Sequence, residues 1–208
     1  MKVLVLGSTG GTGQQLVKLS LEQNHEVTAL ARDPSKLKQD HKKLTIIGGN
    51  VLDKGVLMKA LEGQDAVVSA LGVGKSLKSN GLISAAVSLL IPAMNTMNVD
   101  RLIFLSAFGV GETFVQANFI QRIIFKLILR NIYFDKAIGD GQIHRSALDW
   151  TLVYPVVLTD GIATGNYKTG DKLQMRGMPK ISRADVADFM LRQLTDNSFV
   201  KKSVILMS

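Results

Sequence analysis

The glycine-rich stretch near the start of the chain constrains the fold more than any other feature of the sequence. Residues 3–6 form a short apolar run with valine at alternate positions, and a segment with helical apolar spacing begins at Gln14. Between them, Gly7, Gly10 and Gly13 stand three residues apart, a spacing one residue longer than the common G-x-G-x-x-G. A tight turn alone explains such glycines, but strand, glycine turn and helix in this order indicate a dinucleotide site, because the backbone can approach a pyrophosphate at the helix N-terminus.

Short apolar segments and helical segments continue to alternate along the chain. Strands are predicted at 26–31, 44–47, 65–70, 101–106 and 150–154, with an edge strand at 203–207. This alternation predicts an α/β fold of the Rossmann type, with a doubly wound, mostly parallel sheet in a single domain over residues 1–208. Substrate-side loops and a helix are expected from about 110–135 and 156–182.

Composition narrows the chemistry further. The chain has 208 residues, 46% of them hydrophobic and 20% charged, which is typical of one soluble globular domain. It has no cysteine, which excludes disulfides, thiolate metal sites and a cysteine nucleophile. The three histidines, at 25, 41 and 144, have no metal-like spacing and are expected at the surface. No basic-then-apolar leader is visible, so a cytoplasmic location is expected.

The net charge of +8 favours anionic partners. The basic residues are scattered, however, for example at Lys36, Lys75, Lys78 and Arg122, and they are not interleaved with aromatic residues. A nucleic-acid partner is therefore not expected. A phosphate-rich cofactor accounts for part of the positive charge and solvated faces for the remainder.

The end of the second predicted strand bears on the choice of cofactor. This position faces the adenosine ribose, where an acidic residue binds the 2′-hydroxyl of NAD and an arginine accommodates the 2′-phosphate of NADP. Arg32 stands there, with Lys36 in the same loop. Asp33 is a candidate acidic ligand one position late, but Asp33-Pro34 is better interpreted as a helix-capping turn. NADP is therefore preferred to NAD.

Several other polar motifs have structural interpretations. Asp53 is expected to cap a helix over 54–61, and Ser182 with Asp185 is expected to form a capping box. Pro92 should kink or split the apolar helix over 82–97. The glycine-rich segment 161–177 is expected to form a loop or hairpin over the ligand edge.

The segment 114–132 is less ordinary. Six side chains at helical spacing make one broad apolar face, and Phe125 and Leu129 fall on the other side among Gln121, Arg122 and Arg130; the six are Phe119, Ile120, Ile123, Ile124, Leu127 and Ile128. Three interpretations stay open: a helix packed on the domain, a substrate lid or dimer contact, and a helix lying on a membrane surface. No apolar run approaches the ~20 residues of a transmembrane span.

Six motifs in order resemble one family. They are GSTGGTG at 7–13, VTALARD at 27–33, GGNVLD at 48–53, DAVVSALG at 65–72, LDWTLVYP at 148–155 and ISRADV at 181–186. Together they resemble the atypical short-chain dehydrogenase/reductases, the NAD(P)-binding NmrA-like group that includes flavin reductase/biliverdin-IXβ reductase. The resemblance spans nearly the whole chain and is more specific for dinucleotide binding than for substrate.

The resemblance implies roles for particular positions. The pyrophosphate would lie on Gly7, Ser8, Thr9, Gly10, Gly11, Thr12 and Gly13. Arg32 and Lys36 would hold the 2′-phosphate, Asn50 and Val51 would cover the adenine, and Ala70, Leu71 and Gly72 would border the ribose. Ser106 matches the active-site serine of the family, and Tyr154, Pro155 and Val156 would flank the nicotinamide, with Val157 following.

The sequence also departs from the family. Asn50 replaces a common acidic residue, and Val156-Val157 stands where the flavin reductase carries a histidine. The Tyr-x-x-x-Lys pair of most short-chain dehydrogenases is missing; Tyr133 and Lys136 are three apart on nearly the same helical face. Lys136 is a candidate catalytic residue or a solvated lysine, and Ser106 is a catalytic candidate or a strand-end serine bonded to the next turn.

The sequence thus predicts an NADPH-dependent oxidoreductase that passes hydride to a small acceptor. Flavins or quinone-like compounds are favoured because they need little help from a side-chain acid, and Ser106 would orient the carboxamide or the acceptor. The alternative is a non-catalytic NADP(H)-binding redox sensor or assembly protein. The predicted state is a monomer or homodimer without a transmembrane span.

Overall fold

The computed structural model describes every residue except 75, 77, 78 and 176, so Lys75 and Lys78 lie outside the described residues. Ten strands occur in this part of the chain: β1 (Lys2–Leu6), β2 (Glu26–Ala31), β3 (Leu44–Gly48), β4 (Ala66–Ser69), β5 (Arg101–Leu105), β6 (Asp149–Pro155), β7 (Val157–Thr159), β8 (Lys168–Gly170), β9 (Lys180–Ser182) and β10 (Lys202–Met207). Six helices accompany them: α1 (Gly11–Glu22), α2 (Lys54–Leu61), α3 (Leu82–Thr96), α4 (Phe119–Leu127), α5 (Arg130–His144) and α6 (Arg183–Arg192).

The main sheet has the order β3-β2-β1-β4-β5-β6-β10-β8. Every pairing in it is parallel except that of β8 with β10. Strands β7 and β9 form a separate parallel pair. The predicted doubly wound, mostly parallel Rossmann-type sheet is therefore confirmed.

One prediction about the sheet was wrong. Residues 203–207 do form a strand, β10, but β10 is not at the edge, because β8 pairs with its outer side in antiparallel orientation. The short run Lys168–Gly170 lies inside the segment 161–177 that was expected to be a loop or hairpin. Its three residues are too few to give a period-2 signal in the sequence.

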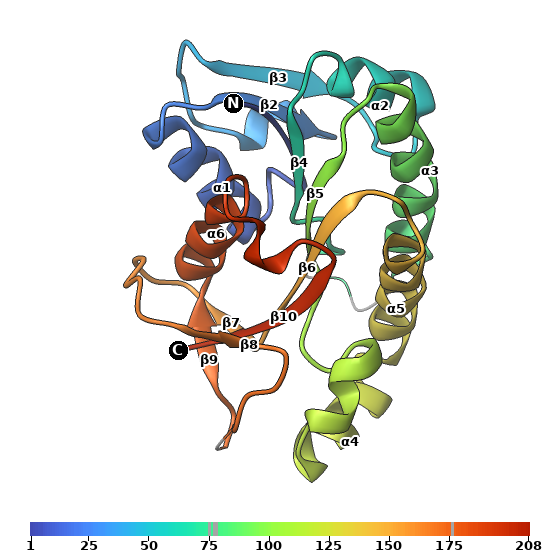
Figure 1. Cartoon of the computed structure of the whole chain (residues 1–208), viewed down its shortest axis with the longest axis vertical. Coiled ribbons are helices and arrows are strands. Elements are labelled where there is room, and N and C mark those ends of the chain that lie inside the picture. The colour runs from blue at the N-terminus through green and yellow to red at the C-terminus, as the bar shows by residue number, and fades with distance from the viewer. Residues whose placement is uncertain (75, 77–78, 176) are drawn as a thin grey trace.

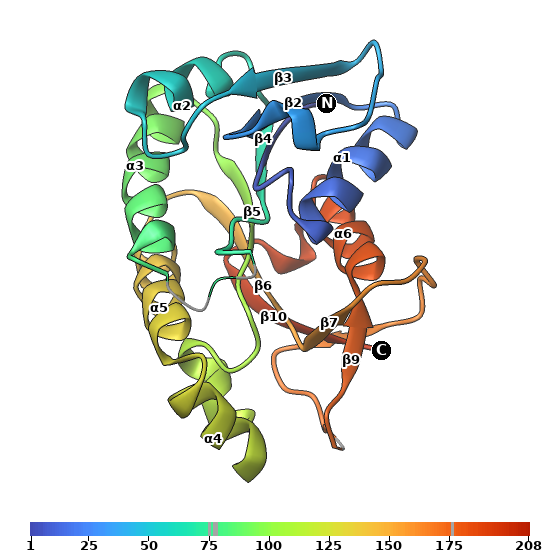
Figure 2. The ribbon, with the colours of Figure 1, turned by 180° about the vertical axis from the view of Figure 1, so that it is seen from behind.

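Helices cover both faces of the sheet. Figures 1 and 2 show α1 and α6 side by side on one face, and α2, α3 and α5 on the other. Helix α4 projects from one end of the molecule, where it adjoins α5 rather than the sheet. The crossovers between the two faces bring the ends of β1, β2, β4, β5 and β6 to one edge.

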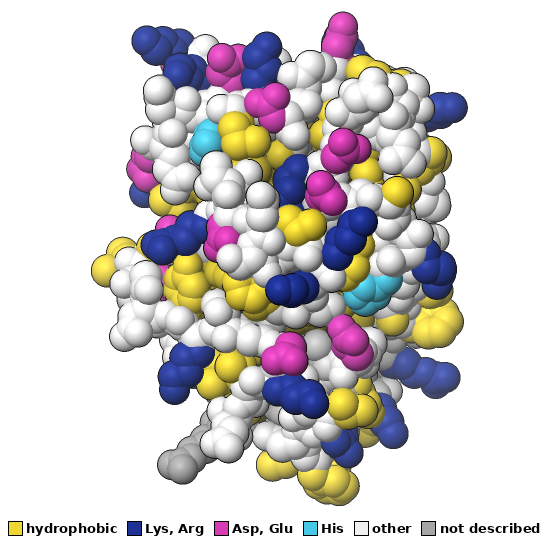
Figure 3. Space-filling view, viewed as in Figure 1, with side chains coloured by type: hydrophobic (Ala, Val, Ile, Leu, Met, Phe, Trp, Pro, Cys, Tyr) yellow, Lys and Arg dark blue, Asp and Glu magenta, His cyan; other side chains and the backbone are white. Residues whose placement is uncertain are grey.

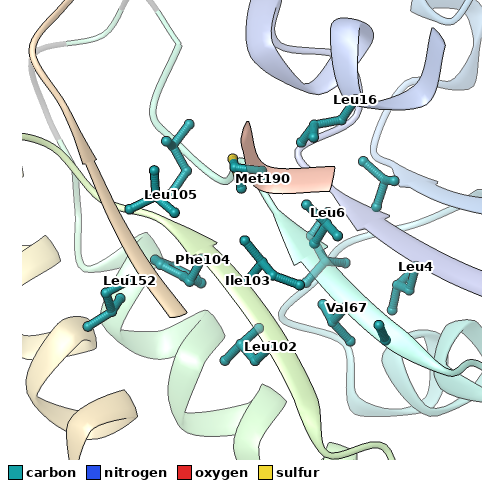
Figure 4. Packing of buried hydrophobic residues seen from close by; sticks show 14 of the residues in the cluster. Leu4, Leu6, Leu16, Val67, Leu102, Ile103, Phe104, Leu105, Leu152 and Met190 are labelled. Atoms are coloured by element: carbon teal, nitrogen blue, oxygen red, sulfur yellow. The ribbon is translucent and has the colours of Figure 1, made fainter. Parts of the chain in front are cut away.

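The core lies between the sheet and these helices, as Figure 4 shows for Leu4, Leu6, Ile103 and Phe104 from the strands with Leu16 from α1. All five side chains are fully buried. Central strands are apolar along their length because helices cover both of their faces. Burial of this kind stabilises a fold by ~25 cal/mol per Å² of apolar surface removed from water.

The predicted caps of Asp33 and Asp53 are confirmed: Asp33 accepts from the Ser35 N–H at 3.2 Å, and Asp53 from the Gly55 N–H at 2.8 Å. Ser182 accepts from the Asp185 N–H at 2.9 Å, but the Asp185 carboxylate accepts instead from the backbone of Thr164 and Gly165, so the predicted reciprocal box is wrong. Pro92 lies inside α3 without splitting it.

Candidate functional site

A cavity of about 1140 Å³ opens along the carboxyl ends of the parallel strands. Residues directly after β1, β2, β4, β5 and β6 line it, which is where open α/β sheets bind ligands. Both predicted catalytic residues, Ser106 and Lys136, lie in its wall. So do the predicted cofactor residues, with the exception of Ser8, Gly13 and Tyr154.

Glycine is required at two positions of the turn between β1 and α1. Gly7 has φ +72°, and a Cβ there would lie 2.5 Å from the Ala70 carbonyl oxygen. A Cβ on Gly13 would lie 2.0 Å from the Gly7 carbonyl oxygen. The turn therefore closes against the first residues of α1, and side chains at either position would force it open.

The N-terminus of α1 is suited to an anion. No side chain caps it, and its first turn carries no acidic residue. The first N–H groups of a helix have no partner within the helix, so they and the helix dipole attract negative charge. Gly10, Gly11 and Thr12 bring this terminus into the cavity wall. The local geometry fits the pyrophosphate of a dinucleotide.

Three cationic side chains stand along the same half of the cavity. Arg32 and Lys36 lie at the end of β2, where Lys36 is 3.4 Å from Asp33. Arg183, at the start of α6, runs beside Gly11 and forms an ion pair with Asp160 at 2.7 Å. A phosphate-rich ligand would meet positive charge at both the glycine turn and the ribose position, so the residues present fit a nicotinamide dinucleotide.

Ser106 belongs to a buried polar network at the other half. Its hydroxyl donates to Asp140 Oδ2 at 2.6 Å, and the Tyr154 hydroxyl donates to the same oxygen at 3.1 Å. Asp140 is 3% exposed, and no donor in the described part of the chain reaches its Oδ1. Burial raises the pKa of Asp140, although Ser106 and Lys136 partly offset this. The Ser106 hydroxyl thus donates to Asp140 and not to the next turn, which was the alternative interpretation of this serine.

Lys136 is buried beside this network rather than solvated. It is 8% exposed, and its ammonium donates to the Leu105 carbonyl oxygen at 3.2 Å. Burial lowers the pKa of Lys136, while Asp140 and Asp135 act in the opposite direction. The interpretation of Lys136 as a surface lysine is therefore wrong: α5 turns this side chain into the cavity wall.

Tyr133 lies in the same wall, three residues before Lys136 on α5. Its hydroxyl donates to the Phe108 carbonyl oxygen at 3.0 Å, and burial raises its pKa. A phenol that is already donating to the backbone and is hard to ionise is poorly placed to protonate an acceptor. Its ring instead contacts Phe125 of α4, with the centroids 4.9 Å apart.

Asp135 ties α5 to the beginning of α3. Its carboxylate accepts from the N–H groups of Ile83 and Ser84, both at 2.9 Å, and from the hydroxyls of Ser79 and Ser84. Burial opposes ionisation, but these hydrogen bonds outweigh it and lower the pKa of Asp135. This anchor fixes the register of α5 and hence the places of Tyr133, Lys136 and Asp140.

The three predicted cofactor residues outside the cavity wall support it from behind. Ser8 is fully buried and donates to the Leu30 carbonyl oxygen at 3.1 Å. Gly13 packs against the turn, as described above. Tyr154 is 1% exposed and faces Asp140. Ser8 and Gly13 thus contact Leu30 and Gly7, which line the cavity, whereas Tyr154 contacts Asp140, which lies behind Ser106.

The far wall of the cavity comes from α4. Gln121, Ile124 and Phe125 line it, and Phe125 packs on Gly109, where a Cβ would lie 2.2 Å from the ring. Asn118 and Gln121 form a capping box that starts the helix. The predicted apolar face is divided: Ile124 lines the cavity, whereas Phe119 is 78% exposed and Leu127 is 77% exposed.

Sequence reasoning did not identify Asp140 or Arg183 as site residues. Asp140 stands four residues after Lys136, so helical spacing could have placed both on one face of α5. Arg183 follows the capping serine of α6, and nothing in its local sequence indicates that α6 lies beside α1. Only the tertiary arrangement brings it to the glycine turn.

Residues 7–197 match the NAD(P)H-binding family, and the chain belongs to that family. This match covers every residue that lines the cavity except Leu6. The expected resemblance to NAD(P)-binding short-chain dehydrogenase/reductase relatives is thereby confirmed at the level of family and fold. The family match establishes an NAD(P)H-binding domain and covers NADH and NADPH alike.

Three known proteins are similar to the chain in sequence or in fold. The chain is 26% identical over 206 residues to the uncharacterized protein YwnB of Bacillus subtilis, covering 93% of this chain and 92% of YwnB. It resembles the crystal structure of a short-chain dehydrogenase/reductase from Veillonella parvula in complex with NADP, with a TM-score of 0.84, 18% identity and coverage of 100% and 94%. It also resembles ChuY, an anaerobilin reductase from Escherichia coli, with a TM-score of 0.83, 20% identity and coverage of 100% and 97%.

Proposed function

We propose that the protein is an NADPH-dependent oxidoreductase that transfers hydride to a small acceptor such as a flavin or a quinone-like compound. The observation that carries the proposal is a single cavity with two unlike halves. A glycine turn with cations forms one half, and Ser106 and Lys136 with an apolar wall form the other. Relatives named as a reductase and as an NADP complex share the fold and support this proposal.

Arg32 and Lys36 are the residues that favour NADP over NAD in this proposal. Guanidinium and ammonium groups at the end of the second strand suit a 2′-phosphate, whereas NAD is usually held there by a carboxylate. Asp33 is the nearest carboxylate, and it is engaged with Ser35 and Lys36. Asn50 and Val51 would lie against the adenine, and Ala70 to Gly72 against the ribose.

When bound, NADPH supplies the hydride, and the chain orients the reactants. Because Ser106 donates its proton to Asp140, it presents a lone pair to the cavity and so suits an N–H donor such as a carboxamide. Lys136 donates to Leu105 and has two further N–H donors for a ribose hydroxyl or the acceptor. Solvent supplies the proton that accompanies the hydride.

A non-catalytic NADP(H)-binding sensor or assembly protein is the second candidate. The observation that favours it is the engagement of Tyr133 with the Phe108 carbonyl, since Tyr133 is then not available as a side-chain acid. This candidate and the reductase share the same dinucleotide half and differ only in turnover.

Purified protein would be incubated with NADPH and a panel of flavins and quinones, with NADPH oxidation and NADPH binding followed together. Turnover of at least one acceptor is expected. Tight binding without turnover of any acceptor would overturn the reductase and support the sensor.

The cofactor preference has a separate test. Arg32→Ala is expected to reduce the preference for NADPH over NADH by about tenfold or more, through loss of one charge-assisted phosphate contact. Lys38→Ala is the matched control, since Lys38 is exposed nearby but does not line the cavity. An unchanged preference in Arg32→Ala would contradict the NADP assignment.

We also propose that residues 1–208 form a single domain, with substrate-side segments at about 110–135 and 156–182. The proposed location is the cytoplasm, and the proposed state is a monomer or a homodimer. Within the described residues, no helix has both the length and the apolar character needed to cross a bilayer.

A further inference from the structure

Helix α4 presents an apolar face to the outside of the molecule. Phe119, Ile123 and Leu127 follow one another at four-residue spacing, and Ile120 lies beside them. The exposed fraction of the side chain is 78% for Phe119, 63% for Ile120, 42% for Ile123 and 77% for Leu127. We call these four residues the outer face of α4. Large exposed apolar patches of this kind in folded proteins mark interaction surfaces.

The outer face is separate from the cavity side of the same helix. Gln121, Ile124 and Phe125 point inward, and Phe125 contacts Phe108 and Tyr133. Figures 1 and 2 show α4 projecting from the end of the molecule, where no other helix or strand covers it. The outer face is thus convex, and the core packing that holds α4 in place does not use it.

Basic side chains flank the outer face. Arg122 and Lys126 lie along one side of it and Arg130 follows α4, while residues 113–134 contain no aspartate or glutamate. Arg122 and Lys126 stack on Phe114, 5.7 and 5.6 Å from the ring centre. In the view of Figure 3, hydrophobic and basic side chains lie together at the end of the molecule where Figure 1 draws α4.

The apolar outer face and its basic flank together indicate which kind of partner can bind α4. A second copy of the same face would bring like charges together, which disfavours a symmetric dimer there. A convex helix with an apolar stripe and a basic flank suits a flat boundary, where its side chains enter the acyl region and its cations meet anionic headgroups. We propose that α4 docks the protein on the surface of a bilayer that contains anionic lipids.

This proposal does not depend on NADPH turnover. Both the apolar and the ionic parts are needed, because a short apolar stripe alone gives weak adsorption and each nearby cation adds to it. The docking is therefore expected to weaken as ionic strength rises.

The test is co-sedimentation of the purified protein with phosphatidylcholine vesicles that either contain or lack phosphatidylglycerol. At low salt, binding is expected only with phosphatidylglycerol present, and it should fall at high salt. The double variant Phe119→Ser/Leu127→Ser should lower the partition coefficient about tenfold or more. Lys126→Glu should lower it about fivefold or more.

Matched controls use the same chemical changes elsewhere. Ile162→Ser removes a side chain that is 84% exposed on another loop, and Lys42→Glu reverses an exposed charge away from α4. The Ile162→Ser control should bind like the wild type, and Lys42→Glu should lose less than Lys126→Glu. Unchanged melting temperatures would show that all variants are folded.

Three outcomes would overturn the proposal. The first is failure of the wild type to sediment with anionic vesicles at low salt. The second is equal loss of binding in the α4 variants and their controls. The third is a dimer in size-exclusion chromatography that Phe119→Ser/Leu127→Ser converts to a monomer, which would assign the outer face to a second copy of the chain.

Discussion

The two halves of the cavity are built in different ways. The dinucleotide half consists largely of consecutive residues, the turn from Gly7 to Gly13, whose shape depends on the absence of side chains. The other half is lined by Ser106 from the end of β5 and Lys136 from α5, and behind them Ser106 and Tyr154 of β6 both donate to the buried carboxylate of Asp140. The first half is a local backbone structure, and the second is a tertiary one.

This difference has energetic consequences. The glycine turn has no room for added atoms where its backbone segments lie closest together, so substitutions there act through steric clashes. The serine half is held by hydrogen bonds around Asp140, and a buried network of this kind responds to charge and pH. Substitutions in the two halves should therefore lower affinity or stability for different physical reasons.

Gly13→Ala should have the largest effect. The added Cβ would lie 2.0 Å from the Gly7 carbonyl oxygen, so the turn must open. We expect the affinity for NADPH to fall by about a hundredfold and the free energy of unfolding by about 1–3 kcal/mol. Fluorescence titration and urea unfolding measure these changes. Gly55→Ala is the control, because Gly55 does not line the cavity and its Cβ would lie 3.4 Å from Asp53 Oδ1; it should keep the affinity.

Lys136→Met should lower both stability and turnover. It takes away the ammonium that lies beside the buried Asp140 and that donates to the Leu105 carbonyl oxygen, so the free energy of unfolding should fall by about 1–3 kcal/mol. NADPH oxidation with the best acceptor should fall by about tenfold or more. Lys42→Met, an exposed lysine, should change neither quantity. Full turnover in Lys136→Met would remove this residue from the site.

Asp140→Asn should change how stability depends on pH. The pKa of Asp140 is raised above its ordinary value of 3.8 in the native protein. At pH values above 3.8 the native protein therefore binds more protons than the unfolded chain. The wild type therefore loses stability as pH rises through this window, by up to about 1.4 kcal/mol per pH unit, whereas Asp140→Asn does not. Urea unfolding at several pH values compares them, and parallel curves would contradict the assignment.

Tyr154→Phe should have the smallest effect. It removes the 3.1 Å hydrogen bond to Asp140 but leaves the ring packed and the Ser106 bond in place. The expected loss is about 1 kcal/mol of unfolding free energy. NADPH affinity should remain within about twofold, because Tyr154 does not line the cavity. A large loss of affinity would indicate direct contact with the ligand.

The sequence was a good guide wherever topology alone places a residue. Arg32 and Ser106 follow parallel strands directly, so the ends of β2 and β5 carry them to the ligand edge. It was a poor guide where the position depends on how helices face each other. Asp140 and Arg183 were not recognised as site residues, and Lys136 was left with two interpretations. The edge strand β8 has only three residues and was too short to be detected from the sequence.

Helix α4 gives the clearest example of this limit. Periodicity grouped Phe119, Ile120, Ile123 and Leu127 correctly but put Ile124, which lines the cavity, with them, and it does not say whether a face meets the core or the solvent. The orientation of α4 depends on Phe125, whose ring fits over Gly109 because glycine has no side chain there. That contact is a long-range pairing and carries no local signal.

The seating of Phe125 on Gly109 also makes the wall contributed by α4 a separable part of the architecture. The helix stands outside the eight-stranded sheet, and its inner residues line the cavity instead of packing between strands. A larger side chain at position 109 would displace the ring and lift the helix as a unit. The structure thus combines a cofactor half whose shape is set by the glycine turn with a cover that is seated on Gly109 through one aromatic ring.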